Sequence, residues 1–217
     1  MTPSDSPAAA ALLDHLVLAT ADLAQGRRWL QDRLGVELQD GGEHHLFGTH
    51  NALVGLGNAY LELIAINPQA PAPERPRWFE LDTPEMQARL AQEPQLIHWV
   101  VGVPDLWTAL RQIPEALGEV TPLSRGMNRW LLSVPRDGSL PFGGVMPSLI
   151  EWESLAPTAR LEDRGVRLSC LQLSTPDPER LTRALDPLRL EGVPLEVEAG
   201  PTRLRATLQT PGGVVVL

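Results

Sequence analysis

The feature that most constrains the fold of this chain is a repeated segment, in which an apolar run that carries a histidine is followed by an aspartate. The segment occupies residues 13–23 and again residues 96–106, and its histidine and aspartate are both displaced by 83 positions (98 minus 15, and 105 minus 22). A third apolar run, residues 168–173, precedes Asp177 and has Cys170 at the place of the histidines. Segments that recur in register predict a fold built from one repeated supersecondary unit.

Each copy has the pattern of a strand, a helix and three further strands. The apolar runs are typical of strands. The aspartates suit helix N-caps, because their side chains accept hydrogen bonds from the first helical turn. Breaks rich in turn residues divide the segments that follow. We expect helices over residues 23–34, 106–117 and 179–188, and strands over residues 36–39, 51–56, 59–66, 118–123, 129–134, 148–153, 195–198, 204–209 and 213–217.

The pattern predicts an α+β fold of three βαβββ modules. The first two cover residues 13–67 and 96–155, and a proline-rich linker over residues 68–95 joins them. A third, degenerate module covers residues 166–217. Pro114 lies within the second helix and should end or kink it.

Composition narrows the class of protein. The formal charge is −9 and all 18 basic residues are arginine, so the chain offers no basic stripe for nucleic acid and no lysine for a Schiff base. The single cysteine excludes a disulfide within the chain and fits a reducing compartment. No apolar run reaches the roughly 18 residues of a membrane span, and residues 1–13 lack the positive start of a signal peptide. We expect a cytoplasmic protein that does not bind membranes.

Acidic residues recur with the histidines. Glu62 lies 47 positions after His15, and Glu151 lies 53 positions after His98, each within the last strand expected for its module. A carboxylate inside an apolar strand is costly to bury unless it is paired or bound to a metal. Two imidazoles and two carboxylates would suit Zn, Ni, Mn, Fe or Co. The alternative is that these side chains hydrogen-bond a ligand or one another without any metal.

The chain resembles the vicinal oxygen chelate superfamily, and within it the glyoxalase-like domain proteins. The resemblance covers roughly residues 13–217 and is most specific at residues 45–51 (HLFGTHN), 56–62 (LGNAYLE) and 143–152 (GGVMPSLIEW). It implies that paired βαβββ modules curl into cupped, partly open mixed sheets. It also implies metal ligands in the first and last strands of the modules, at the positions of His15, Glu62, His98 and Glu151.

Other side chains are candidates for contact with a substrate. His45 and His50 precede a strand, where they form either a polar turn or the rim of a cleft. Arg125 is either solvated or a clamp for a carboxylate. Trp99 and Trp152 suit a cleft wall or the core. The third module has Cys170 in place of histidine and no carboxylate in residues 213–217, so we expect no second site there and a buried, inert thiol; that module would cover the sheet or contact a second copy in a homodimer.

Three functions follow as hypotheses. The first is a lyase or isomerase in which a divalent ion chelates a small vicinal-oxygen compound while Glu62 or Glu151 moves a proton. Ring-cleaving dioxygenation ranks lower, because the only tyrosine, Tyr60, is next but one to a proposed ligand. The second is a metal-free module that binds a hydrophobic small molecule or confers resistance to one. The third is a non-catalytic partner with a dry, filled cleft.

Overall fold

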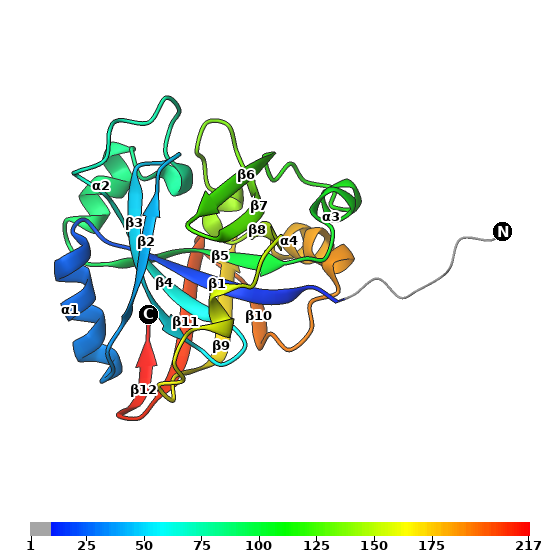
Figure 1. Ribbon diagram of the computed structural model, residues 1–217. Helices are drawn as coiled ribbons and strands as arrows, with labels where there is room; N and C mark the ends of the chain where they lie inside the picture. The colour runs from blue at the N-terminus through cyan, green and yellow to red at the C-terminus, as the bar shows by residue number, and fades with distance from the viewer. Residues whose placement is uncertain (1–9) are drawn as a thin grey trace.

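Strands β1 (Leu12–Ala19) and β5 (Gln95–Gly102) lie antiparallel in the middle of an eight-stranded sheet, where the two halves of that sheet meet. The computed structural model describes residues 10–217 (Figure 1). The expectation for an amino-terminal targeting segment rested mostly on residues 1–9, which lie outside the described residues. The order of strands in the sheet is β2-β3-β4-β1-β5-β8-β7-β6.

Each half of this sheet is one βαβββ module, as predicted. In both, the first strand pairs in parallel with the fourth, and the other pairings are antiparallel. The first module continues from β1 with α1 (Leu23–Leu34), β2 (Gln39–His44), β3 (Thr49–Gly55) and β4 (Tyr60–Ile66). The second continues from β5 with α3 (Leu106–Gln112), β6 (Glu119–Arg125), β7 (Asn128–Val134) and β8 (Ser148–Trp152).

The helices begin at the predicted aspartates. Asp22 accepts a hydrogen bond from the Gln25 backbone N–H at 2.7 Å, and Asp105 accepts one from Thr108 at 2.9 Å. Helix α3 ends at Gln112, before Pro114, as expected for a residue that cannot continue a helix. Strand β2 starts at residue 39, whereas a strand over residues 36–39 was predicted. Its polar, glycine-rich sequence hides the alternation that marks a strand.

The third segment has the element order of a βαβββ module but a different pairing. It contains β9 (Arg167–Thr175), α4 (Pro178–Leu185), β10 (Leu195–Ala199), β11 (Arg203–Thr210) and β12 (Gly213–Val216). Its sheet has the order β10-β9-β11-β12, so the first strand lies between the second and third instead of beside the fourth. The third segment therefore shares the order of elements with the two modules but pairs its strands differently.

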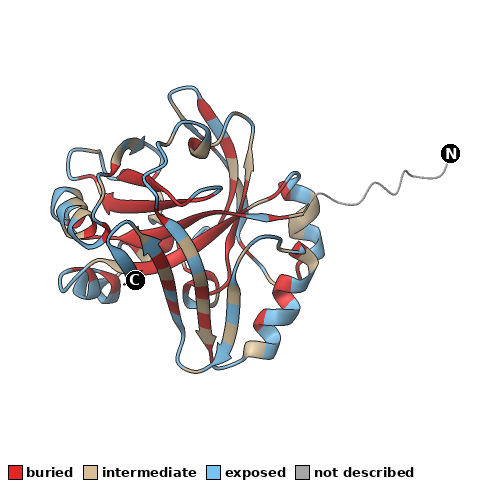
Figure 2. Cartoon of the chain, turned by 90° about the horizontal axis from the view of Figure 1, so that it is seen from below, coloured by how far each residue is buried: buried red, intermediate tan, exposed pale blue. Residues whose placement is uncertain are grey.

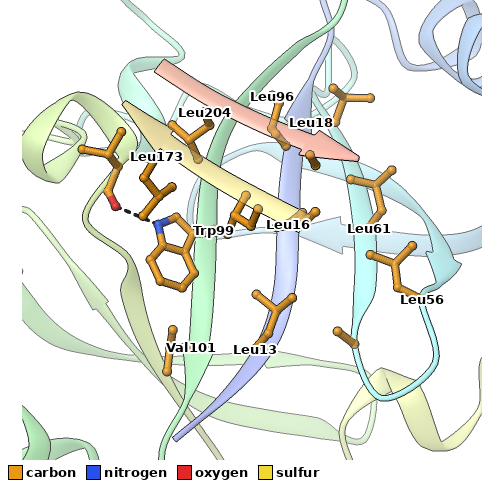
Figure 3. Packing of buried hydrophobic residues seen from close by; sticks show 14 of the residues in the cluster. Leu13, Leu16, Leu18, Leu56, Leu61, Leu96, Trp99, Val101, Leu173 and Leu204 are labelled. Carbon is orange, nitrogen blue, oxygen red and sulfur yellow. Dashed lines mark hydrogen bonds between the residues drawn. The ribbon is translucent and has the colours of Figure 1, made fainter. Parts of the chain in front are cut away.

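The second sheet packs on one face of the central strands. Leu173 of β9 and Leu204 of β11 lie over Leu16 of β1 and Leu96 of β5, in one core cluster (Figure 3). Buried and exposed residues alternate along β11, which leaves its other face to solvent (Figure 2). The alternation along β1 sends Leu16 and Leu18 into this core, while His15 and Val17 face the opposite, concave side of the large sheet.

The predicted linker is ordered and partly buried. It contains a short 3-10 helix (Trp78–Glu80) and α2 (Pro84–Leu90), which Thr83 caps through a hydrogen bond from the Met86 backbone N–H at 3.2 Å. Trp78 and Phe79 are 4% and 5% exposed and belong to the core on the concave side. This segment is therefore part of the wall of the cup. Among residues 10–217, the helices are all too short or too polar to cross a membrane.

Candidate functional site

A small polar cavity lies on the concave side of the large sheet, between the two modules. Its volume is about 30 Å³, which is room for a water molecule or one functional group of a ligand. Polar and aromatic side chains from both modules and from the 3-10 helix surround it. They are His15, His44, Asn51, Tyr60, Glu62, Trp78, Phe79, Arg125, Trp130 and Trp152, together with Leu132 and Ile150.

Glu62 is the centre of the polar contacts in this cavity. Its side chain is 7% exposed, and Asn51 Nδ2 donates a hydrogen bond to its Oε1 at 2.5 Å. His15 Nε2 lies 3.7 Å from Oε2, and His44 Nε2 lies 3.9 Å from Oε1. A buried carboxylate requires such partners, because an unpaired charge in a low-dielectric interior is strongly unfavourable. Two imidazole nitrogens and one carboxylate therefore face the same small volume.

The orientation of His15 is fixed by Asp14. The Asp14 carboxylate accepts a hydrogen bond from His15 Nδ1 at 2.6 Å, and its other oxygen accepts one from Trp152 Nε1 at 2.7 Å. The imidazole also stacks on the Tyr60 ring, with centroids 4.6 Å apart. Because Nδ1 is engaged, the ring presents Nε2 to Glu62, an arrangement that sets which nitrogen can exchange a proton in the cavity.

His44 is the second imidazole of the cavity, and it is neutral at physiological pH. Burial lowers its pKa to about 4, and the opposing effect of the Glu62 charge is smaller. Its Nδ1 lies 3.1 Å from Thr49 Oγ1, and its ring meets the edge of Trp78. Burial likewise raises the pKa of Tyr60 well above its usual value, with the Asp14 and Glu62 charges acting in the same direction. Tyr60 therefore stays protonated.

Arg125 reaches the site from the second module. It ends β6, and its Nη1 donates a hydrogen bond to Asn51 Oδ1 at 3.1 Å, so Asn51 links the guanidinium to Glu62. Gly41 and Gly42 make this approach possible. A Cβ on Gly41 would stand 1.9 Å from Asn51 Oδ1, and one on Gly42 would stand 2.7 Å from Arg125 Cδ. A residue larger than glycine at position 41 or 42 would therefore block the contact between the two modules.

In the second module, the counterpart of Glu62 is Ser148. Val17 pairs with Glu62 across β1 and β4, and Val100, 83 positions after Val17, pairs with Ser148 across β5 and β8. His98 accordingly contacts Ser148: the Ser148 backbone N–H donates to His98 Nε2 at 3.1 Å, while Nδ1 donates to a backbone carbonyl, that of Gly144, at 3.1 Å.

Both nitrogens of His98 are thus satisfied by its own module. Burial lowers its pKa to about 3, against the effect of the Gly144 hydrogen bond. The Phe79 ring lies 5.2 Å from the imidazole, centroid to centroid, and His98 is fully buried and does not line the cavity. His98 is therefore a core residue in this arrangement.

Glu151 lies on the other face of the sheet. Ile150 and Trp152 line the cavity, so the residue between them points away. Glu151 Oε2 accepts a hydrogen bond from the Leu106 backbone N–H at 2.7 Å, at the start of α3. It is three positions beyond Ser148, and an odd displacement along a strand reverses the face. The sequence-based equivalence of Glu151 with Glu62 is therefore wrong in register.

The four predicted metal ligands do not meet. The structure brings His15 and Glu62 together and leaves His98 and Glu151 engaged elsewhere. Within residues 10–217, no group of three or more His, Cys, Asp or Glu side chains is placed to hold a metal ion. The residues present therefore do not fit the metal centre that the superfamily resemblance implied, and a guanidinium two hydrogen bonds from Glu62 adds a positive charge to the same site.

The predicted substrate contacts divide in the same way. Arg125 and Trp152 line the cavity. The His45 side chain is 81% exposed and lies 3.8 Å from Glu43, outside the cavity. His50 is also outside, and its buried Nε2 has no hydrogen-bond partner within the described residues. Trp99 belongs to the opposite core and donates a hydrogen bond to the Val145 carbonyl at 2.9 Å (Figure 3).

Several residues of the site were not predicted from the sequence. Asp14 directly precedes His15, and this neighbouring pair was a visible signal. His44 directly precedes His45 but was not among the candidates, and Asn51 carried no distinguishing pattern. The predicted linker contains two adjacent aromatic residues, Trp78 and Phe79. Adjacent aromatic residues indicate burial, and the prediction of a linker did not take them into account.

Paired βαβββ modules that enclose a polar cavity define this fold as that of the vicinal oxygen chelate superfamily. Within it, residues 13–189 match the Glyoxalase-like domain family, and the chain belongs to that family. A hypothetical protein from Staphylococcus aureus has the same fold, at 15% identity and a TM-score of 0.62, over 89% of this chain and 88% of that one.

Methylmalonyl-CoA epimerase from Mycobacterium tuberculosis is 21% identical, over 73% of this chain and 96% of that one, with a TM-score of 0.43. No protein of curated function matches the sequence.

Proposed function

We propose that the protein is a lyase or isomerase that moves a proton on a small oxygenated compound, with Glu62 as the proton acceptor. The observation that carries the proposal is the environment of Glu62. This buried carboxylate faces a cavity, holds a hydrogen bond from Asn51, and has two imidazole nitrogens within 4 Å of its oxygens. Acid–base catalysis needs a proton acceptor and a second group that returns the proton, both within reach of one substrate.

The roles follow from the contacts. Glu62 would remove a proton from a carbon next to a carbonyl group. His15, whose Nδ1 donates to Asp14, would accept that proton from Glu62 at Nε2 and return it to the substrate, so that both side chains end as they began. Arg125 uses one N–H on Asn51 and has further donors for the oxygen on which negative charge develops. His44, neutral because of its burial, would accept or donate a hydrogen bond without adding charge.

A divalent ion was the sequence-based expectation for the charge-stabilising group. The predicted ligands do not converge, so the steps above use only side chains of the chain itself. In this proposal the guanidinium of Arg125 takes the electrostatic role that a Lewis acid would otherwise have. The proposed reaction is still that of a lyase or isomerase, and metal analysis of the purified protein tests whether it binds an ion.

The size of the cavity limits what enters it. About 30 Å³ holds one functional group, so the rest of a substrate would occupy space now taken by the aromatic wall. Trp78 and Phe79 form part of that wall and belong to the segment that connects the two modules. Phe79 and Glu80 have φ angles of 61° and 57°, a region that is unfavourable for side chains other than glycine. We propose that this turn moves when substrate binds.

Hydrogen–deuterium exchange at carbon tests the proposal. In D₂O, the protein should accelerate exchange of the C–H bonds next to the carbonyl of pyruvate or hydroxyacetone, followed by NMR. Glu62→Gln should slow the exchange about 100-fold or more, whereas Glu153→Gln, at an exposed position of the second module, should leave it unchanged. Equal exchange by wild type and Glu62→Gln would contradict the assignment. So would one metal ion per chain in untagged protein that is lost in His15→Ala.

A metal-free binding module is the second candidate, and the aromatic wall favours it. Trp78, Trp130 and Trp152 border the cavity, and tryptophan rings suit planar or apolar ligands. This function predicts quenching of tryptophan fluorescence by a ligand that the protein leaves unchanged. Binding without any exchange at carbon, in both wild type and Glu62→Gln, would favour it over catalysis.

A further inference from the structure

A second cleft lies between the large sheet, helix α1 and strand β11 of the second sheet. It has a volume of about 360 Å³ and shares no residue with the cavity around Glu62. Leu18 of β1 and Leu96 of β5 contribute to its apolar part. A volume of this order is in the range of small-molecule sites in proteins.

Strand β12 pairs with only part of the β11 edge that borders the cleft. Strand β12 pairs with β11 from Thr207 to Thr210, and Leu217 exchanges backbone hydrogen bonds with Ala206. Within residues 10–217, no strand pairs with the stretch Arg203–Arg205 on that edge. Helix α1 and the segment after α2 flank the vacant edge, and their polar side chains complete the lining.

The lining is strongly basic. Its charged side chains comprise four arginines and one glutamate, a formal charge of +3 (four minus one) in a chain of −9: Arg33, Arg89, Arg203, Arg205 and Glu93. Arg203 and Arg205 alternate with the buried Leu204, so both side chains leave β11 on the face opposite to Leu204, and they border an outer hollow with Glu198 as well as the open edge of the cleft. Neither forms an ion pair within the described part of the chain.

The other two arginines are weakly engaged. Arg33 lies over the Trp29 ring, 4.2 Å from its centroid, and its Nη2 is 3.9 Å from Glu93. Among residues 10–217, the Arg89 guanidinium donates only a long hydrogen bond to Gln95, at 3.5 Å. Like charges around one cleft repel each other, and an anion that enters removes this repulsion. Guanidinium groups also bind carboxylate and phosphate oxygens through two parallel N–H donors.

We propose that this cleft binds a small organic molecule with two or more negative charges, carried by phosphate or carboxylate groups. Arg203 and Arg205 would contact the anionic groups from β11, and Arg33 and Arg89 would contact them from the facing helices. The Trp29 ring would hold Arg33 in place through its contact with the guanidinium. The proposal is independent of the reaction at Glu62.

Isothermal titration calorimetry with pyrophosphate and citrate tests the proposal, at low salt and at 150 mM NaCl. Wild type should bind at least one probe, and Arg203→Ala combined with Arg205→Ala should weaken binding at least tenfold. The matched control combines Arg28→Ala with Arg160→Ala, two exposed arginines outside the cleft that change the net charge equally. A preference for pyrophosphate would identify a phosphate ligand, and a preference for citrate a polycarboxylate.

Two results would overturn the proposal. One is the absence of binding to wild type by either probe at low salt. The other is an equal loss in the control, which would show general attraction to positive charge. Arg89→Ala alone should also weaken binding. Because Arg89 lies on α2, this variant shows whether weaker binding by the β11 variant reflects a folding defect. Thermal unfolding of each variant checks that it is folded.

Discussion

The Arg125 guanidinium of β6 donates a hydrogen bond to the Asn51 side chain of β3 at 3.1 Å, and Asn51 in turn donates to Glu62. This contact connects the two modules above the cavity, and it places a positive charge and a buried carboxylate at either end of one amide. Removal of that amide should therefore affect both the stability of the cup and the behaviour of Glu62.

Asn51→Ala should lower the free energy of unfolding by about 1–3 kcal/mol, because Glu62 Oε1 loses a buried hydrogen bond and Arg125 loses its acceptor. Asn58→Ala, at an exposed turn, is the control and should have little effect. Denaturation in urea measures both. If the two variants were equally stable, the bridge between the modules would have no energetic role.

The stability of the protein should fall from pH 6.5 to pH 4 because His44 and His98 stay neutral in the folded chain. Burial lowers their pKa values to about 4 and about 3, so over this range the unfolded state binds protons that the folded state does not. Stability from these two groups is complete above the unfolded pKa and is lost as the pH falls.

Each such proton contributes a slope of about 1.4 kcal/mol per pH unit. His44→Gln and His98→Gln should each reduce the slope between pH 6 and pH 4.5. His45→Gln, at an exposed side chain, should leave it unchanged. An unchanged slope in the His98 variant would mean that this imidazole is protonated in the folded protein.

Glu151→Ala should weaken the start of helix α3 without affecting chemistry at Glu62. Its carboxylate accepts a hydrogen bond from the Leu106 backbone N–H, and loss of such a cap costs about 1 kcal/mol. Exchange at carbon should match wild type. Activity that disappears in Glu151→Ala while the fold persists would restore this residue to the site. Glu153→Ala is the exposed control.

Trp78→Ala should open the aromatic wall. Trp78 is 4% exposed and stacks on Phe47, with ring centroids 4.1 Å apart, so truncation should cost about 3–5 kcal/mol. The space left has the shape of an indole ring, and added indole should raise the melting temperature of the variant more than that of wild type. Trp107→Ala, at a tryptophan that is 58% exposed, should show neither effect.

The two-module architecture could be predicted from local pattern alone. Histidine, aspartate and the apolar runs recur in register, and the aspartates at 22 and 105 cap the helices as expected. The pairing of His15 with Glu62 was expected from their recurrence in the sequence and from the family resemblance, and the register of β1 with β4 brings the two side chains together. These features depend on neighbours along the chain.

The second half of the site could not be predicted in the same way. Glu151 resembles Glu62 in its apolar surroundings, and only the pairing of Val100 with Ser148 shows that the counterpart lies three residues earlier. His44 and Arg125 meet near Glu62 because the edge strands β2 and β6 approach each other, a contact between segments that are far apart in the chain.

The sequence by itself determined the order of strands and helices along the chain and the helix starts, since side-chain periodicity and capping act over a few residues. Only the tertiary structure decided which strands pair, in which register, and what fills the cup. The third segment has the element order of a module, yet β9 lies between β10 and β11. Strand order is set by which apolar faces pack together, and that depends on the whole chain at once.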